Sequence, residues 1–277
     1  MSLIIIHALP RSGSTWLQRI LLSHPNFDGI GESWIFPFLY FAFHIKNSGY
    51  IDAHLIDIAL EDLEDFSRSR DISDFRGYMF DCAKNYLDNL GVEKHYVEKT
   101  PRNYLVCDDL LRLEGVKHIV LMREPVDIWL SMRNTWMNGR MWRWPLYKRD
   151  FTIGLQELEK LTALNQVHRV DYESLKSEFS EEIQKIGSFI NEDLSICFER
   201  GVNQMSGRLG DPSFRQIKSE KRIIKGISYW DKRVMSKYGI SAEITNITPF
   251  RFILDMADYY VGKLYNIYKI FWQKKYL

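Results

Sequence analysis

The first part of the chain constrains the fold more than any other. A short β-branched run, Leu3–His7, is followed by a loop and then by helical spacing from Thr15 to Leu22. The start of a helix presents unpaired N–H groups at the positive end of its dipole, and Gly13 lets the backbone approach a ligand closely. This strand–loop–helix unit predicts a site for phosphate or sulfate.

Side chains of the loop add further donors. Arg11 supplies a fixed charge, and Ser12, Ser14 and Thr15 supply hydroxyls. A nucleoside-triphosphate loop needs the pattern G-x-x-x-x-G-K-[ST]. Here Ala8 stands at the first glycine and Ser14 at the lysine, and no strand end offers a convincing magnesium-binding acid. The spacing therefore disfavours a triphosphate site.

The rest of the chain alternates strands with helices. This order predicts an α/β fold with three layers, in which helices cover both faces of a mostly parallel sheet and further helices are inserted. No repeat, low-complexity segment or linker is visible, so we expect a single domain over residues 1–277. The expected strands are Phe27–Ile30, His95–Glu98, Val116–Met122 and Gln166–Val170, and the expected helices are Ile51–Leu90 with a break near Asp71–Asp74, Pro125–Trp136, Gly154–Leu164 and most of the chain beyond Glu173.

Composition limits the partners and the compartment. A formal net charge of +1 provides no whole-molecule field for nucleic acid or an acidic membrane, so an anion site must be built locally. Cys82, Cys107 and Cys197 form no C-x-x-C pair and are expected to be small buried residues in a reducing compartment. The longest apolar stretch, Trp34–Phe43, is too short to span a bilayer. We therefore expect a soluble, cytoplasmic protein.

A second group of functional residues follows the Val116–Met122 strand. Arg123 ends this buried strand, and Ser131 stands about two turns into the next helix, in the pattern R-x-P-x-D-x-x-x-S. Arginine supplies a forked and always charged set of donors, so these two residues could converge on one dianion. Asp127 belongs to the first turn of the helix and is better explained as a helix-terminus residue than as a ligand.

Together these two patterns resemble those of the PAPS-dependent sulfotransferases, where PAPS is 3′-phosphoadenosine 5′-phosphosulfate. Pro10–Leu17 resembles the 5′-phosphosulfate loop, in the form typical of bacterial and tyrosylprotein enzymes rather than cytosolic ones. The resemblance runs from residue 3 to about residue 230. It implies a fold like that of P-loop NTPases, PAPS as co-substrate with no metal, and a 3′-phosphate held by Arg123 and Ser131.

Sulfuryl transfer needs cations near the bridging oxygen and a base for the acceptor proton. Besides Arg11, the resemblance implies Lys99, in the segment Glu98–Asn103, as a cation; a solvated surface lysine is the alternative. It also implies Glu32 as the base, since Gly31-Glu32 resembles the element that carries the base in tyrosylprotein sulfotransferases. Pro101 stands where cytosolic enzymes carry a catalytic histidine, and Glu98 and His95 are the remaining candidates for the base.

Four weaker matches complete the expected site. The family stacks adenine near Trp16, for which core packing is the alternative, and brings a tyrosine equivalent to Tyr172 to the nucleotide. Lys225 resembles a residue that closes over the 3′-phosphate. Ser228 matches a serine that supports the transition state in the tyrosylprotein branch.

The acceptor side is less well defined. Aromatic-rich segments at Trp34–Phe43 and Thr135–Tyr147 are candidates for lining an acceptor pocket, although core packing is favoured for the first. Tyr259–Leu277 mixes aromatic residues with lysines, and we expect a terminal helix that covers the sheet rather than a membrane-binding one. The predicted function is sulfuryl transfer from PAPS to a hydroxyl or amine. A kinase or nucleotide hydrolase and a non-catalytic nucleotide-binding module are the alternatives.

Overall fold

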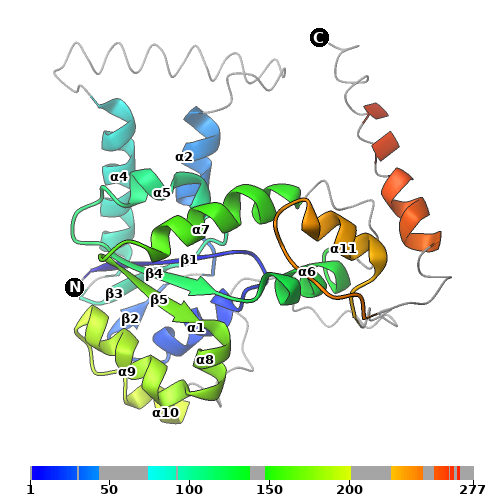
Figure 1. Cartoon of the computed structure of the whole chain (residues 1–277). Helices are drawn as coiled ribbons and strands as arrows, with labels where there is room; N and C mark the ends of the chain where they lie inside the picture. The colour runs from blue at the N-terminus through cyan, green and yellow to red at the C-terminus, as the bar shows by residue number, and fades with distance from the viewer. Residues whose placement is uncertain are drawn as a thin grey trace.

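A computed structural model describes residues 2–29, 31–43, 74–91, 93–137, 147–200, 226–245, 253–261, 263–264 and 267–268. Its centre is a five-stranded sheet with the order β2-β3-β1-β4-β5, in which every pairing is parallel (Figure 1). The α/β fold class is thereby confirmed. The strands are β1 Leu3–Ala8, β2 Phe27–Asp28, β3 His95–Glu98, β4 Lys117–Met122 and β5 Val167–Asp171.

The central strand β1 is buried on both faces. Ile4 and Ile6 pack into one hydrophobic cluster, whereas Leu3 and Ile5 pack into another. Successive side chains of a strand point to opposite faces of the sheet, so a continuous apolar run can fill two cores at once. This pattern is typical of a parallel strand covered by helices on both sides.

Two helical layers cover the sheet (Figure 1). The helices of the layer that packs on Ile4 and Ile6 come directly after β1 or after β5 in the chain. It contains α1 Ser14–Leu22, α8 Tyr172–Ser177, α9 Phe179–Ile190 and α10 Ile196–Arg200. The opposite layer contains α2 Ile35–Phe43, α4 Phe75–Leu90, the 3₁₀ turn η1 Asn103–Val106, α5 Cys107–Leu110, α6 Pro125–Asn134, the π-helical turn η3 Asp150–Gly154, α7 Leu155–Thr162 and α11 Tyr229–Ser236.

Most expected elements are present, with small differences at their ends. Strand β2 ends at Asp28 rather than Ile30, and α6 ends at Asn134 rather than Trp136. Residues 51–73 of the first long helical prediction lie outside the described residues, as do residues 138–146 of the second aromatic segment.

One expectation about the cysteines is wrong. Cys107 and Cys197 are buried, but Cys82 is exposed. Helix α4 buries Phe80, Ala83 and Leu87 on one face. Because residues three and four apart share a face of a helix, Cys82 is turned away from that face.

Within the described part of the chain, no helix has the length and apolar character needed to cross a membrane.

Candidate active site

The candidate residues meet at one edge of the sheet because they all follow the carboxyl ends of parallel strands. The loop after β1 carries Arg11 and Gly13, Lys99 follows β3, Arg123 follows β4, and Tyr172 follows β5. The chain runs from β1 to β2 and β3 on one side, and to β4 and β5 on the other. Such a switch point in a parallel sheet leaves a crevice where ligands bind.

The loop after β1 has a conformation that depends on Gly13. Gly13 is the N-cap residue of α1 and has φ 99°, and a Cβ at this position would clash with the ring of Tyr172. Arg11 also has positive φ, 69°, which is unusual for a residue with a side chain. The loop therefore brings the backbone close to Tyr172 and presents the first N–H groups of α1.

Arg11 joins the two sequence motifs. Its Nε donates to Ser131 Oγ at 3.2 Å, and its carbonyl oxygen accepts from Arg123 Nη1 at 3.2 Å. The Nε of Arg123 is buried and has no hydrogen-bond partner in the described structure. A buried donor of this kind is costly unless a ligand accepts its hydrogen bond, so these residues fit a bound anion.

Two aromatic residues border this cluster. The Arg123 guanidinium lies 4.4 Å from the centre of the Tyr172 ring. Trp16 packs edge-on against Tyr172 at 5.6 Å and stacks on Phe179 at 6.3 Å. Tyr172 thus holds Arg123 in place, while Trp16 is half-buried between α1 and the helices after β5.

Lys99 and Glu32 form an ion pair beside the loop. Lys99 Nζ lies 3.0 Å from Glu32 Oε1 and 3.3 Å from Thr15 Oγ1. Lys99 is only 1% exposed, so the solvated-lysine alternative is wrong. The Lys99 ammonium is therefore held next to the first turn of α1, where it can reach an anion bound by the loop.

The other oxygen of Glu32 is held by Trp34. Trp34 Nε1 donates to Glu32 Oε2 at 3.1 Å, and the Trp34 backbone, with φ 58°, donates its N–H to Thr100 Oγ1 at 3.2 Å. The Thr100 hydroxyl in turn donates to Glu98 Oε1 at 2.6 Å. Left-handed backbone at a residue other than glycine is uncommon, and it is often found where a side chain has a function.

Comparison with known proteins identifies the family. A model described as the sulfotransferase family matches residues 4–195, which is more than half of the chain.

The chain belongs to the sulfotransferase family.

One curated relative is similar over most of the chain. It is nodulation protein NoeE of Sinorhizobium fredii (strain NBRC 101917 / NGR234), 28% identical over 238 residues. The match covers 78% of this chain but 56% of that protein, so the chain spans little more than half of this relative's length.

Two solved structures are similar to this chain, and the first of them shows the same fold. The sulfotransferase domain from the curacin biosynthetic pathway is matched with a TM-score of 0.52 and 16% identity, over 87% of this chain and 99% of that one. The sulfotransferase domain from the Synechococcus PCC 7002 olefin synthase has a TM-score of 0.47 and 18% identity, over 92% and 93% of the two chains.

Ser12 is placed differently from the other loop hydroxyls. It is fully buried, and both its N–H and its hydroxyl donate to the Leu9 carbonyl, at 3.2 and 2.7 Å. Because these donors are already used inside the loop, Ser12 shapes the loop rather than offering its hydroxyl to a ligand. Ser14 is buried at the start of α1, and Thr15 accepts from Lys99.

The other two candidates for the base have different surroundings from Glu32. His95 begins β3, at the opposite edge of the sheet, and its Nε2 lies 2.8 Å from Glu192 Oε1. Glu98 is at the correct edge but is fully buried, and this burial raises the pKa of its carboxyl group. Of the three, only Glu32 combines partial exposure with a contact to Lys99.

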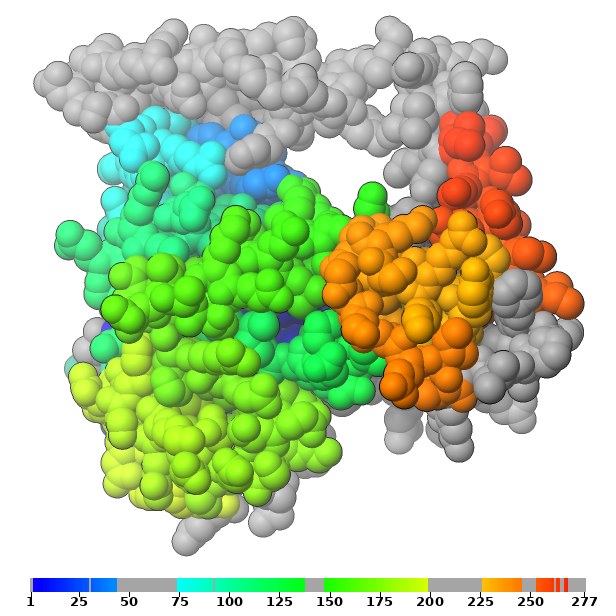
Figure 2. All heavy atoms as spheres, viewed as in Figure 1, coloured from blue at the N-terminus to red at the C-terminus, as the bar shows by residue number. Residues whose placement is uncertain are grey.

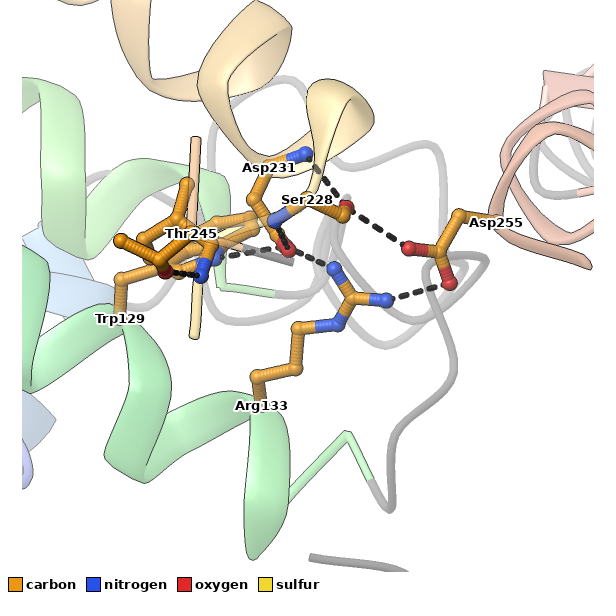
Figure 3. A network of polar contacts seen from close by, with 7 residues as sticks. Trp129, Arg133, Ser228, Asp231, Thr245 and Asp255 are labelled. Atoms are coloured by element: carbon orange, nitrogen blue, oxygen red, sulfur yellow. Dashed lines mark hydrogen bonds and ion pairs between the residues drawn. The ribbon is translucent and has the colours of Figure 1, made fainter. Parts of the chain in front are cut away.

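Ser228 lies in a polar network with Arg133, Asp231 and Asp255 (Figure 3). It is the N-cap of α11 and is 2% exposed, and its hydroxyl bonds Asp255 Oδ2 at 2.8 Å. Its surroundings include Arg133, on a different face of α6 from Ser131. The role in the transition state that the family resemblance implies for Ser228 stays a prediction, and Lys225 lies outside the described residues.

No motif of the sequence predicts a role for Arg102, Asp150 or Tyr104, which form a polar group next to the Trp34 ring. Arg102 pairs with Asp150, with Nε–Oδ1 at 3.1 Å, and its guanidinium lies 5.9 Å from the Trp34 ring centre. Asp150 is 1% exposed and also accepts from Tyr104 at 2.7 Å. The position of Arg102 three residues after Lys99 was the available signal, whereas Asp150 has no sequence motif around it.

Proposed function

We propose that this sulfotransferase takes PAPS as donor and transfers its sulfuryl group to a hydroxyl or amine by in-line displacement. The observation that carries the proposal is the contact between the two motifs, in which Arg11 bonds Ser131 and Arg123 bonds the Arg11 carbonyl. A site for an adenylate with phosphates at both its 3′ and 5′ ends needs two groups of donors, and this edge of the sheet provides them side by side.

The residues divide into two binding groups. Arg123 and Ser131 would hold the 3′-phosphate, and Arg123 still has an unpaired buried donor to offer. The N–H groups at the start of α1, together with Arg11, Thr15 and Lys99, would hold the 5′-phosphosulfate. Trp16 and Tyr172 would border the adenosine. Lys225 is the further contact that the family resemblance implies for the 3′-phosphate.

Catalysis in this proposal comes from charge and position. The donor supplies a sulfuryl group on a good leaving group, and Arg11 and Lys99 stabilise the negative charge that remains on the phosphate. Glu32 takes the proton of the acceptor as the new bond to sulfur forms and the bond from sulfur to the phosphate oxygen breaks. The products are the sulfated acceptor and 3′-phosphoadenosine 5′-phosphate.

The acceptor would approach from the side of α2. Within the first aromatic segment Phe36 and Leu39 are buried, whereas Trp34, Phe38 and Phe41 remain exposed. One face of α2 therefore packs into the core as expected, and the other face is exposed and could contact the acceptor. A cavity of about 540 Å³ lies farther along this helix, with Tyr40 and Arg149 among its lining residues.

Calorimetry tests the donor directly. We expect 3′-phosphoadenosine 5′-phosphate to bind without magnesium and more tightly than ATP or AMP. Arg123→Ala should weaken binding by at least about tenfold, because a charge-assisted bond contributes about 1.5–3 kcal/mol. Arg169→Ala is the matched control, since Arg169 is exposed on β5. ATP binding that requires magnesium would instead support a kinase, and no nucleotide binding would support a non-catalytic module.

A further inference from the structure

The helical residues near the C-terminus have an exposed apolar face. Residues 253–261, 263–264 and 267–268 are helical and lie away from the sheet, beyond α11 (Figure 1). The other residues of Tyr259–Leu277, which was expected to cover the sheet, lie outside the described residues. Ile253, Tyr260, Leu264 and Ile267 recur at intervals of seven, four and three, which places them on one face of a helix. Together with Val261 and Tyr268, each is between 50% and 67% exposed.

The opposite side of this helix is fixed to the body of the protein. Asp255 is 1% exposed and bonds Arg133 Nη2 at 2.6 Å and Ser228 Oγ at 2.8 Å (Figure 3). Tyr259 packs on Trp230 with ring centres 5.3 Å apart. Figure 2 accordingly shows the red C-terminal residues lying beside the orange residues of α11 on the surface. These contacts orient the helix with its apolar face outward.

Positive charge surrounds the same region. Arg233 lies 5.1 Å from the Trp230 ring centre, Lys237 Nζ bonds Tyr259 Oη at 3.1 Å, and Lys263 lies 5.1 Å from the Tyr259 ring centre. Two acidic residues of this region, Asp231 and Asp255, are buried and paired with Arg133. A third acidic residue, Asp258, is partly exposed on the helix itself, so the exposed cations Arg233, Lys237 and Lys263 outnumber the carboxylates of the helix that reach the surface.

The C-terminal part of the sequence is also biased toward positive charge. From residue 259 to residue 277 there is no Asp or Glu, while Lys263, Lys269, Lys274 and Lys275 alternate with tyrosine, phenylalanine and tryptophan. Lysines and aromatic rings beside an apolar stripe are the composition of helices that lie in the membrane interface. Anionic lipid attracts each nearby lysine by about 1 kcal/mol.

We propose that this helix and the cations beside it form a docking surface for an anionic lipid bilayer. A second copy of the chain fits less well, because pairing two such stripes would bring lysines together with no acidic partners from residues 259–277. A bilayer accepts the apolar stripe and the positive charge at the same time. None of the residues of this surface belongs to the proposed donor site or is the proposed base, so the proposal does not depend on the donor or the acceptor.

Vesicle co-sedimentation of the full chain tests this surface. We expect binding to vesicles of equimolar phosphatidylglycerol and phosphatidylcholine, weak binding to phosphatidylcholine alone, and loss of binding as salt screens the charges. Replacing both Leu264 and Ile267 by Glu should weaken binding by at least about tenfold, since each apolar side chain contributes about 1.5–3 kcal/mol when buried. Lys263→Glu should weaken it by at least about fivefold.

The matched control is Tyr86→Glu, which introduces the same charge at a residue 57% exposed on α4 and should leave binding unchanged. Circular dichroism and thermal unfolding should be the same for all variants, because the substituted side chains are exposed. The proposal is overturned if anionic vesicles do not bind the protein, or if the stripe variants bind as the parent does. It is also overturned if the stripe instead forms a dimer, detected by light scattering, that Leu264→Glu disrupts without any vesicle binding.

Discussion

Arginine is central to two polar clusters of this protein, and the clusters differ in what satisfies their charges. At the sheet edge Arg11, Lys99 and Arg123 lie near Glu32. The other carboxyl group beside Lys99, that of Glu98, is buried and its pKa is raised by this burial, so positive charge is in excess among these residues. In the C-terminal cluster Arg133 is fully buried between two carboxylates, Asp231 and Asp255. An excess of positive charge at the sheet edge favours an anionic ligand, whereas the guanidinium of Arg133 is already paired with both carboxylates of its cluster.

The two clusters also differ in how they are built. The sheet-edge residues each follow a strand by a few positions, so the sheet sets their positions. In the C-terminal cluster, Arg133 of α6 pairs with Asp231 and Asp255, which follow it in the sequence by 98 and 122 positions. Trp129 Nε1, also on α6, donates to Asp231 at 2.9 Å. We therefore expect substitutions in the first cluster to alter binding and rate, and substitutions in the second to alter stability.

The largest effect should come from Glu32→Gln. Removal of the proposed base should lower kcat by about 100- to 10,000-fold, while the amide keeps the size of the side chain and its bond from Trp34. Affinity for 3′-phosphoadenosine 5′-phosphate, measured by calorimetry, should change little. Glu243→Gln, at an exposed position, is the control. Full activity of the Glu32 variant would remove this residue from the mechanism.

Arg133→Met should affect stability instead. It leaves Asp231 and Asp255 buried without their cation, which costs about 3–5 kcal/mol. Thermal and urea unfolding should show this loss, and nucleotide affinity of the folded fraction should remain near that of the parent. Arg169→Met, at an exposed arginine, should change neither quantity. A large loss of affinity in Arg133→Met without a loss of stability would contradict the division between the two clusters.

A pH dependence of stability should arise beneath the sheet-edge site. His7 on β1 and His118 on β4 are buried, with Nε2 and Nδ1 3.0 Å apart. Burial lowers the pKa of both, and that of His118 to about 4. Since these folded-state values lie below the unfolded value near 6.5, their contribution is present above pH 6.5 and is lost as pH falls.

For His118 alone the loss at pH 5 should be about 2 kcal/mol. His118→Gln should therefore flatten the dependence of unfolding free energy on pH between 7 and 5. The control Gln184→Asn, at an exposed position without a titratable group, should leave the slope unchanged. If the pH dependence of the unfolding free energy were the same in the His118 variant as in the parent, the His7–His118 pair would not be its cause.

The residues of the sheet-edge cluster could be predicted from the sequence because each belongs to a short motif. Each motif combines a strand, a loop residue and a helix start within about ten positions, and the parallel sheet then brings the motifs together. The Arg133 cluster could not be read in this way, since no pattern relates Arg133 to Asp255. The match of Ser228 to a family serine is likewise local, whereas the bond from its hydroxyl to Asp255, 27 positions away, has no pattern in the sequence.

Trp34 lies in the sheet-edge site, but its contacts could not be predicted from the sequence. Its substitution should have the smallest effect of those considered. Its bond to Glu32 could not be predicted, because it depends on a left-handed backbone at Trp34 that Thr100 holds from the adjacent strand end. Trp34→Phe keeps an aromatic ring and removes the donor. Since Trp34 is 39% exposed, we expect a loss of about 1 kcal/mol, which lowers kcat about fivefold.

The KM for the donor should not change in this variant, because Trp34 contacts the base and not the nucleotide loop. Tyr86→Phe, at a residue 57% exposed on α4, is the control for the loss of an exposed polar group from an aromatic side chain. An unchanged kcat for Trp34→Phe, alongside a large effect of Glu32→Gln, would mean that Lys99 alone is sufficient to orient the carboxylate. A raised KM for the donor would instead place Trp34 in the binding cluster.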